Sequence, residues 1–119
     1  MAEGARVARG IAWGDIRMIE LGGKAGTRPG LVLTRSAVIP YLNAVTLAPI
    51  TRTIRGVHSE LSVGINEGLK TDSVAQLDAI QTVPVSLVGR YVGSLAPMRK
   101  AELAAAILYA FELRALQEH

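Results

Sequence analysis

The chain has 119 residues, half of them apolar, no cysteine and a formal net charge of +3. This length suits one domain with one substantial core, the apolar content argues against intrinsic disorder, and the missing thiols exclude a disulfide scaffold and a thiolate metal site. The longest apolar run, Leu103 to Phe111, spans nine residues, which is too short to cross a membrane. We therefore expect a cytoplasmic domain over residues 11–119, preceded by a disordered tail at residues 1–10 without a secretory signal.

The first half of the chain predicts three strands. Residues 11–21 alternate loosely between apolar and polar side chains, and a glycine-rich loop follows at residues 22–27. A strand at residues 31–34 is an unbroken apolar run, which favours burial on both faces. After a linker or single helical turn at residues 35–43, a third strand covers residues 45–51, where Pro49 indicates a sheet edge or a bulge.

The second half predicts three more strands, at residues 60–66, 73–82 and 87–92, and a helix from Pro97 to about Gln117. On this helix one apolar stripe contains Leu103, Ile107, Leu108 and Phe111, and a nearly opposite one contains Tyr109, Leu113 and Leu116. The second stripe either contacts a partner or belongs to a frayed helix end. The predicted fold class is α+β, mostly β: a small, strongly bent SH3-like β-sheet or barrel with a C-terminal α-helix.

Positive charge is concentrated in one part of the chain. Residues 21–59 contain no Asp or Glu, and residues 1–60 hold eight Lys or Arg against four acids. The acid-free window contains Lys24, Arg28, Arg35, Arg52, Arg55 and His58. A local basic field of this kind is what a polyanionic ligand requires.

The residue inventory argues against several kinds of catalytic site. The chain has two histidines, one of them the terminal His119, so a multi-histidine metal site is not expected. Residues 22–24 do not begin a phosphate loop, because Ala25 replaces the Ser or Thr that would hold magnesium. We expect no metal and no cofactor, and an enzymatic reaction would have to use Arg, Thr, Asp and His.

Five short segments carry the most specific information in the sequence. They are WGDI at residues 13–16, TRPGLVL at 27–33, VTLAPIT at 45–51, DSV at 72–74 with QT at 81–82, and a helix that begins near Met98. Their order and spacing resemble the MazF/PemK/Kid toxins of toxin–antitoxin pairs over about residues 10–116. The resemblance implies a small dimeric endoribonuclease with a bent β-sheet. Such enzymes cleave single-stranded RNA at short sequences without a metal, and an antitoxin silences them by covering the RNA groove with its acidic C-terminal segment.

The resemblance also implies roles for individual residues. Arg28 matches the family's catalytic arginine, and Thr51 matches its catalytic threonine. Asp78 matches an acidic residue proposed as the general base in the Kid branch. His58 is similar in position to a histidine that contacts RNA in some members, and Gln76 stands where the Kid branch has a catalytic arginine. The candidate RNA-binding residues are Lys24, Arg52, Arg55, His58 and Gln76.

These residue types suit metal-free RNA cleavage. A base must remove the proton of the 2′-hydroxyl, an acid must protonate the leaving 5′-oxygen, and donors must stabilise the pentavalent phosphorane. Arg28 offers a planar fork of N–H donors, and the Thr51 hydroxyl adds one more. The base could be Asp78 or His58. The expected products carry a 2′,3′-cyclic phosphate and a 5′-hydroxyl.

Two other functions remain open at this level. A CcdB-like gyrase poison shares the expected fold, but such toxins end in Trp-Gly-Ile, whereas this chain ends in Leu-Gln-Glu-His. A non-enzymatic SH3-like module that binds a peptide or a nucleic acid would need several surface aromatic residues, and this chain has only five aromatic residues in all.

Overall fold

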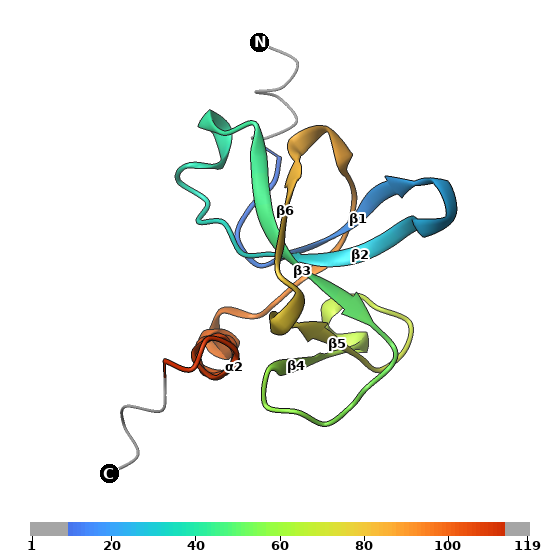
Figure 1. Ribbon diagram of the computed structural model, residues 1–119. Coiled ribbons are helices and arrows are strands. Elements are labelled where there is room, and N and C mark those ends of the chain that lie inside the picture. Colours follow the sequence, from blue (N-terminus) through green and yellow to red (C-terminus); the bar gives the residue numbers. More distant parts are fainter. Residues whose placement is uncertain (1–9, 114–119) are drawn as a thin grey trace.

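The computed structural model describes residues 10–113, which form seven strands, short 3₁₀ turns and one α-helix (Figure 1). The strands are β1 (Asp15–Gly22), β2 (Gly26–Val32), β3 (Ala44–Thr51), β4 (Glu60–Val63), β5 (Ser73–Gln76), β6 (Gln81–Pro84) and β7 (Val88–Ser94). The 3₁₀ turns that matter below are η1 (Gly23–Ala25), η3 (Ile65–Glu67) and η4 (Leu77–Ala79), and the helix is α2 (Lys100–Ala110). The predicted tail at residues 1–10 lies, except for Gly10, outside the described residues.

The strands form an antiparallel sheet in the order β4-β5-β3-β2-β1-β7, with β6 also paired to β3. The central strand β3 joins two groups of strands, because its N-terminal half pairs with β6 and its C-terminal end pairs with β5. In Figure 1, β3 accordingly runs from β6 and the β1–β2 hairpin to the β4–β5 pair. The strongly bent, mostly β fold with a C-terminal helix is therefore confirmed.

The bent sheet buries apolar side chains on both faces. Leu31 and Ala48 belong to a core cluster that includes Leu103 of α2, whereas their chain neighbours Val32 and Leu47 belong to a second cluster. This arrangement follows from strand geometry, since successive side chains point to opposite faces. The predicted burial on both faces is confirmed for Leu31 and Val32, whereas Leu33 and Thr34 lie beyond the end of the strand and are half-buried.

Several predicted boundaries were wrong. Residues 11–14 form a turn, so the first strand starts at Asp15, and the second starts at Gly26 and includes Arg28 and Pro29. The strand predicted at 60–66 ends at Val63, because η3 follows it, and the last strand covers residues 88–94.

The helix is shorter than predicted. It ends at Ala110, and Glu112 adopts a left-handed conformation with φ of 61°. The Leu113 amide donates to the Leu108 carbonyl and the Glu112 amide donates to that of Tyr109, which closes the helix end in a Schellman-type turn. Phe111, which the helical wheel placed in the core stripe, is therefore 54% exposed. The part of the prediction that concerns Leu116 and Gln117 lies outside the described residues.

The strand predicted at residues 73–82 is broken in two by η4, and Pro49 provides the physical reason. Leu47 pairs with Gln81 and Ile50 pairs with Ala75, so the break between β5 and β6 lies opposite Pro49. Proline has no amide proton and cannot donate to a ladder partner. Pro49 does mark an irregularity in the sheet, but the irregularity is the break at η4 between β5 and β6, opposite Pro49, rather than one in β3 itself.

Turn η3 packs against β7 through a close backbone approach. A Cβ atom at Gly93 would overlap the carbonyl of Glu67, and one at Gly68 would overlap that of Val92. Gly68 also has φ of 92°, in the region that favours glycine. These two glycines hold Glu67 in place beside the helix.

Candidate active site

An open pocket of about 670 Å³ lies where the β1–β2 hairpin meets the end of β3. Three strands supply most of the wall, with Met18 from β1, residues 27–29 from β2, and Ile50 and Thr51 from β3. The remaining wall comes from the loops around residues 52–53 and 69–71 and from Ser73 at the start of β5. The structure therefore brings together the two residues that the sequence singled out most strongly, Arg28 and Thr51.

Arg28 is exposed at the pocket wall and is oriented by the hairpin. Its Nε donates a hydrogen bond of 3.0 Å to the carbonyl oxygen of Ala25, in the turn η1 at the hairpin tip. One edge of the guanidinium is thus used to fix the side chain, and the terminal N–H groups remain to meet a ligand. A planar fork of donors held in this way suits two phosphate oxygens.

Thr51 is half-buried at the last position of β3. Its Oγ1 accepts a hydrogen bond of 3.1 Å from the amide of Thr53. The hydroxyl proton remains available, because this contact uses only a lone pair of the oxygen. Thr51 can therefore present one oriented O–H donor to the same ligand as Arg28.

The electrostatics of this pocket are those of an anion site. Three cations line it, Arg28, Arg52 and Lys70, and none of its described lining residues is acidic. The sequence did not indicate Lys70, because this residue lies outside the acid-free window of residues 21–59 and belongs to none of the five motif segments. Its contribution depends on the fold, which places the segment before β5 beside β2.

The other predicted catalytic residue, Asp78, does not line this pocket. It lies in η4, where its carboxylate accepts a hydrogen bond from the hydroxyl of Ser59. Gln76 is half-buried at the end of β5, opposite Glu60 of β4. Neither side chain is among those that surround Arg28 in the same chain.

His58 lines a different pocket, of about 560 Å³, between the start of β4 and the helix α2. Its ring meets that of Tyr109 edge to face, with centroids 5.2 Å apart. Glu60 and Glu102 line the same pocket. His58 is thus placed next to the helix, and the Arg28 pocket receives no histidine from the described part of its own chain.

The remaining cations of the acid-free window are dispersed. Lys24 lies in the exposed turn η1 at the tip of the β1–β2 hairpin. Arg55 is exposed in the loop before β4, where its backbone amide donates to the carboxylate of Glu60. Arg35 lines a separate hollow beside Trp13 and Lys100. The window is therefore not one continuous face, and the fold selects Arg28 and Arg52 from it for the pocket.

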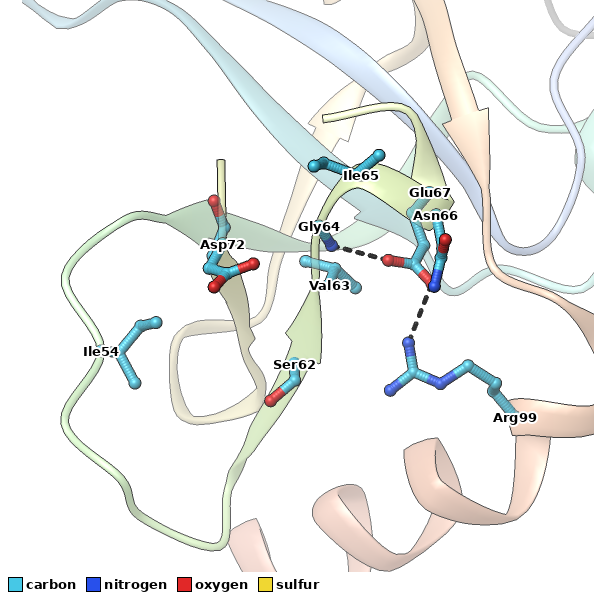
Figure 2. A pocket seen from close by; sticks show the side chains of 10 residues that line it. Ile54, Ser62, Val63, Gly64, Ile65, Asn66, Glu67, Asp72 and Arg99 are labelled. Carbon is cyan, nitrogen blue, oxygen red and sulfur yellow. Dashed lines mark hydrogen bonds and ion pairs between the residues drawn. The ribbon is translucent and has the colours of Figure 1, made fainter. Parts of the chain in front are cut away.

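A third pocket, of about 450 Å³, adjoins the Arg28 pocket and contains a network of ionised groups (Figure 2). The buried Glu67 accepts hydrogen bonds from the amide of Gly64 at 2.6 Å and from Arg99 at 3.1 Å. Arg99 also pairs with Glu102 at 2.7 Å. The hydrogen bond with Glu102 is the largest of the effects that raise the pKa of Arg99, and the same bond lowers the pKa of the exposed Glu102 carboxyl.

Residues 10–113 offer no obvious metal centre and no helix that could span a membrane. In this part of the chain no three His, Cys, Asp or Glu side chains come together as metal ligands. No helix formed by these residues is long and apolar enough to cross a bilayer. The chemistry that the described pocket can offer is that of two oriented hydrogen-bond donors within a cluster of positive charges.

Comparisons with known proteins agree with this arrangement. Residues 12–111 match the family model described as PemK-like, MazF-like toxin of type II toxin–antitoxin system. The chain is 46% identical over 86 residues to endoribonuclease MazF3 of Mycobacterium tuberculosis, covering 72% of this chain and 84% of that protein. It is 36% identical over 102 residues to the probable endoribonuclease MazF5 of the same species, covering 84% and 88%. The solved structure of the M. tuberculosis toxin MazF-mt6 superposes with a TM-score of 0.78 at 42% identity, covering 82% of this chain and 96% of that one.

Proposed function

Because the chain belongs to the PemK-like, MazF-like toxins of type II toxin–antitoxin systems, we propose that its Arg28 pocket is the site at which this endoribonuclease toxin cleaves RNA. The observation that carries the assignment is the meeting of Arg28 and Thr51 in one pocket that also contains Arg52 and Lys70. A phosphodiester brings negative charge to this pocket, and the reaction increases that charge at the phosphate as the phosphorane forms. The protein acts in the cytoplasm, where RNA substrates are present.

The pocket residues have separate roles in stabilising the transition state. The terminal N–H groups of Arg28 bind two non-bridging oxygens of the scissile phosphate, and the Thr51 hydroxyl donates to the oxygen on which charge develops. Arg52 and Lys70 hold the flanking phosphates and align the single strand. Attack by the neighbouring 2′-hydroxyl forms the bond to phosphorus as the bond to the 5′-oxygen breaks, which leaves a 2′,3′-cyclic phosphate and a 5′-hydroxyl.

A homodimer would complete the proton-transfer machinery. Asp78 and His58 are the two candidate bases, and neither lines the Arg28 pocket of its own chain. A role for either in proton transfer therefore requires that it come from a second copy. Mixing an Arg28→Ala protein with an Asp78→Asn or His58→Ala protein would restore one intact site per mixed dimer if that is so, and would leave activity unrestored if each chain works alone.

The regulatory partner would be an antitoxin with an acidic C-terminal segment. Three cations and five hydroxyl-bearing residues line the Arg28 pocket. Carboxylates of an extended acidic peptide can satisfy the same donors as the RNA phosphates. Such a segment would compete with RNA for one site, so added antitoxin should raise the apparent KM for RNA and leave kcat unchanged.

The experiment that tests the proposed function is cleavage of a long, weakly structured RNA in the presence of EDTA, with the new ends mapped by sequencing. We expect discrete cuts at a short recurring sequence, with 5′-hydroxyl ends. Intact RNA in a sample whose folding is confirmed by circular dichroism would refute the proposal. Cuts that disappear only when EDTA is added would refute the metal-independent mechanism alone.

The two alternative functions are not favoured. The related proteins carry endoribonuclease names, and neither a gyrase poison nor a non-enzymatic binding module is among the relatives reported above. Growth arrest on expression, accompanied by RNA decay and no DNA-damage response, would separate the ribonuclease from a gyrase poison.

A further inference from the structure

The pocket in Figure 2 is lined by a different set of chemical groups from the Arg28 pocket beside it. Its opening has Asp72 on one side and Arg99 on the other, with Ser62 between them. Asn66 contributes an amide, and Ile54 and Ile65 contribute exposed apolar side chains, 53% and 74% accessible. A hollow of about 450 Å³ that combines an acceptor, donors and apolar edges is suited to a flat polar ring rather than to a phosphate.

The two pockets adjoin each other. Ser73 lines both of them, and the consecutive residues Thr53 and Ile54 line one each. An RNA strand whose phosphate lies against Arg28 can therefore place a neighbouring base in the pocket that Asp72 lines. Single-stranded RNA is read in this way, by bases that are turned out of the strand and bound by their edges.

Asp72 is the group that decides which ligand fits. The ion pairs among residues 10–113 involve Asp15, Glu67 and Glu102, so the exposed Asp72 carboxylate keeps its acceptor capacity in this part of the chain. Glu67, by contrast, is buried and already bound by Arg99 and by the Gly64 amide. A phosphate would be repelled by Asp72, whereas an exocyclic amino group donates to a carboxylate in the way that Asp and Glu recognise cytosine.

We propose that the pocket formed by Asp72, Ser62, Asn66, Ile54 and Ile65 is a base-recognition subsite that selects a nucleobase bearing an exocyclic amino group over uracil. The Asp72 carboxylate accepts from the amino group, Ser62 and Asn66 bind the rest of the polar edge, and the two isoleucines contact the faces of the ring. Uracil presents carbonyl oxygens at the positions of the amino group, which places two acceptors against each other. The inference rests on the proposed ribonuclease function.

The test compares wild type with Asp72→Ala on RNAs in which one amino group at a time is removed from the mapped cleavage sequence. Cytosine is replaced by uracil, guanine by hypoxanthine and adenine by purine, and kcat/KM is measured for each RNA. In the wild type we expect one position where loss of the amino group lowers kcat/KM by roughly 5- to 150-fold, as for one good base contact. In Asp72→Ala that dependence should disappear at this position only. If Asp72→Ala is unfolded, Asp72→Asn replaces it in the test. The neutral amide oxygen accepts a weaker hydrogen bond than the carboxylate, so the loss of kcat/KM on removal of the amino group should become smaller at this position.

Glu112→Ala is the matched control, since it removes an exposed acid on the far end of the helix and should keep the amino-group dependence intact. A wild type that cleaves RNA but depends on no amino group, or a dependence that survives Asp72→Ala, would overturn this inference alone. A wild type that leaves all RNAs intact would instead refute the proposed function, so the two failures are distinguishable.

Discussion

At the scale of single residues, Thr51 carries a clear chemical prediction because its hydroxyl can be removed without changing the shape of the side chain. Its oxygen accepts from the Thr53 amide, and its proton is free for a ligand. Thr51→Val keeps the branched shape and removes both roles, so we expect kcat/KM for RNA cleavage to fall by about 10²-fold, as for loss of one transition-state donor. Thr51→Ser keeps the hydroxyl and should stay within about 10-fold of wild type. Equal losses in both variants, with unchanged melting temperatures, would show that the hydroxyl is not the active group.

Glu102 provides a prediction about stability and pH. The hydrogen bond from Arg99 lowers the pKa of this carboxyl below its ordinary value of 4.5. A lowered pKa in the folded state means that the ion pair stabilises the protein above the unfolded pKa and that this contribution is lost as pH falls through the folded pKa. Arg99, whose pKa is raised, stays charged throughout this range.

We therefore expect Glu102→Gln to be less stable than wild type at pH 7, and we expect this difference to shrink as the pH falls below the ordinary carboxyl pKa of 4.5. The measurement is urea unfolding at several pH values, with Glu112→Gln as the control for the change in net charge. A difference that stays constant from pH 7 down to the lowest pH at which both proteins fold would assign the loss to packing rather than to the ion pair.

How far the sequence could predict the site depended on the kind of signal each residue had. Arg28 and Thr51 stood within motifs, and both line the pocket. Lys70 had no local signal, since its place beside Arg28 follows from how the segment before β5 packs. Asp78 and His58 were chosen because their positions along the chain match those of functional residues in the family. Within one chain, however, Asp78 contacts Ser59 and His58 contacts Tyr109 of the helix. Sequence spacing cannot show which side of a bent sheet a loop residue faces.

At the scale of elements, the contact between η3 and β7 gives a test of how the pocket lined by Glu67 and Asp72 is supported. Gly93→Ala would push a methyl group into the Glu67 carbonyl, so either β7 or η3 must move. We expect a loss of about 1–3 kcal/mol in the free energy of unfolding, as for overpacking in a core. Ser94→Ala, at an exposed position of the same strand, should change it by less than about 0.5 kcal/mol. An unchanged urea midpoint for Gly93→Ala would mean that this contact is not maintained in solution.

Element boundaries were less predictable than element types, and the reasons are local. The alternation of residues 73–82 indicated one strand, but the ladder partner at Pro49 cannot donate, and the chain turns through η4 there. The helix was predicted too long because its apolar pattern continues past Ala110, whereas its end is set by the left-handed conformation of Glu112. In both cases a backbone constraint overrode the side-chain pattern.

At the scale of the whole molecule, the net charge of +3 is modest, but the positive charge is unevenly distributed. Three cations line the Arg28 pocket, while Asp72, Glu67 and Arg99 line the pocket beside it. An RNA that crosses both pockets therefore meets positive charge at its phosphates and an acceptor at one base. The overall fold explains this separation, because the loops after β3 and before β5 bring the two pockets side by side.

This charge arrangement predicts salt-dependent binding. If Arg28, Arg52 and Lys70 each neutralise one phosphate, log K should fall with log salt at a slope of about −2, from roughly −0.7 for each contact on a single strand. The ligand should be an RNA whose cleavage position lacks the 2′-hydroxyl, so that it binds without reacting. Lys70→Ala should reduce the slope by about 0.7, whereas Arg90→Ala, at an exposed position of β7, should leave it unchanged. A slope near zero would contradict the phosphate contacts.

The central claim is that the Arg28 pocket performs the cleavage, and the most direct test is the single-turnover cleavage rate of Arg28→Ala. We predict a loss of at least roughly 10²- to 10⁴-fold with the fold intact by circular dichroism, since the variant removes the oriented fork of donors from the phosphate. Arg35→Ala removes another exposed arginine, which lies in the separate hollow beside Trp13, and this variant should cleave at the wild-type rate. A folded Arg28→Ala protein that cleaves RNA undiminished would contradict the account.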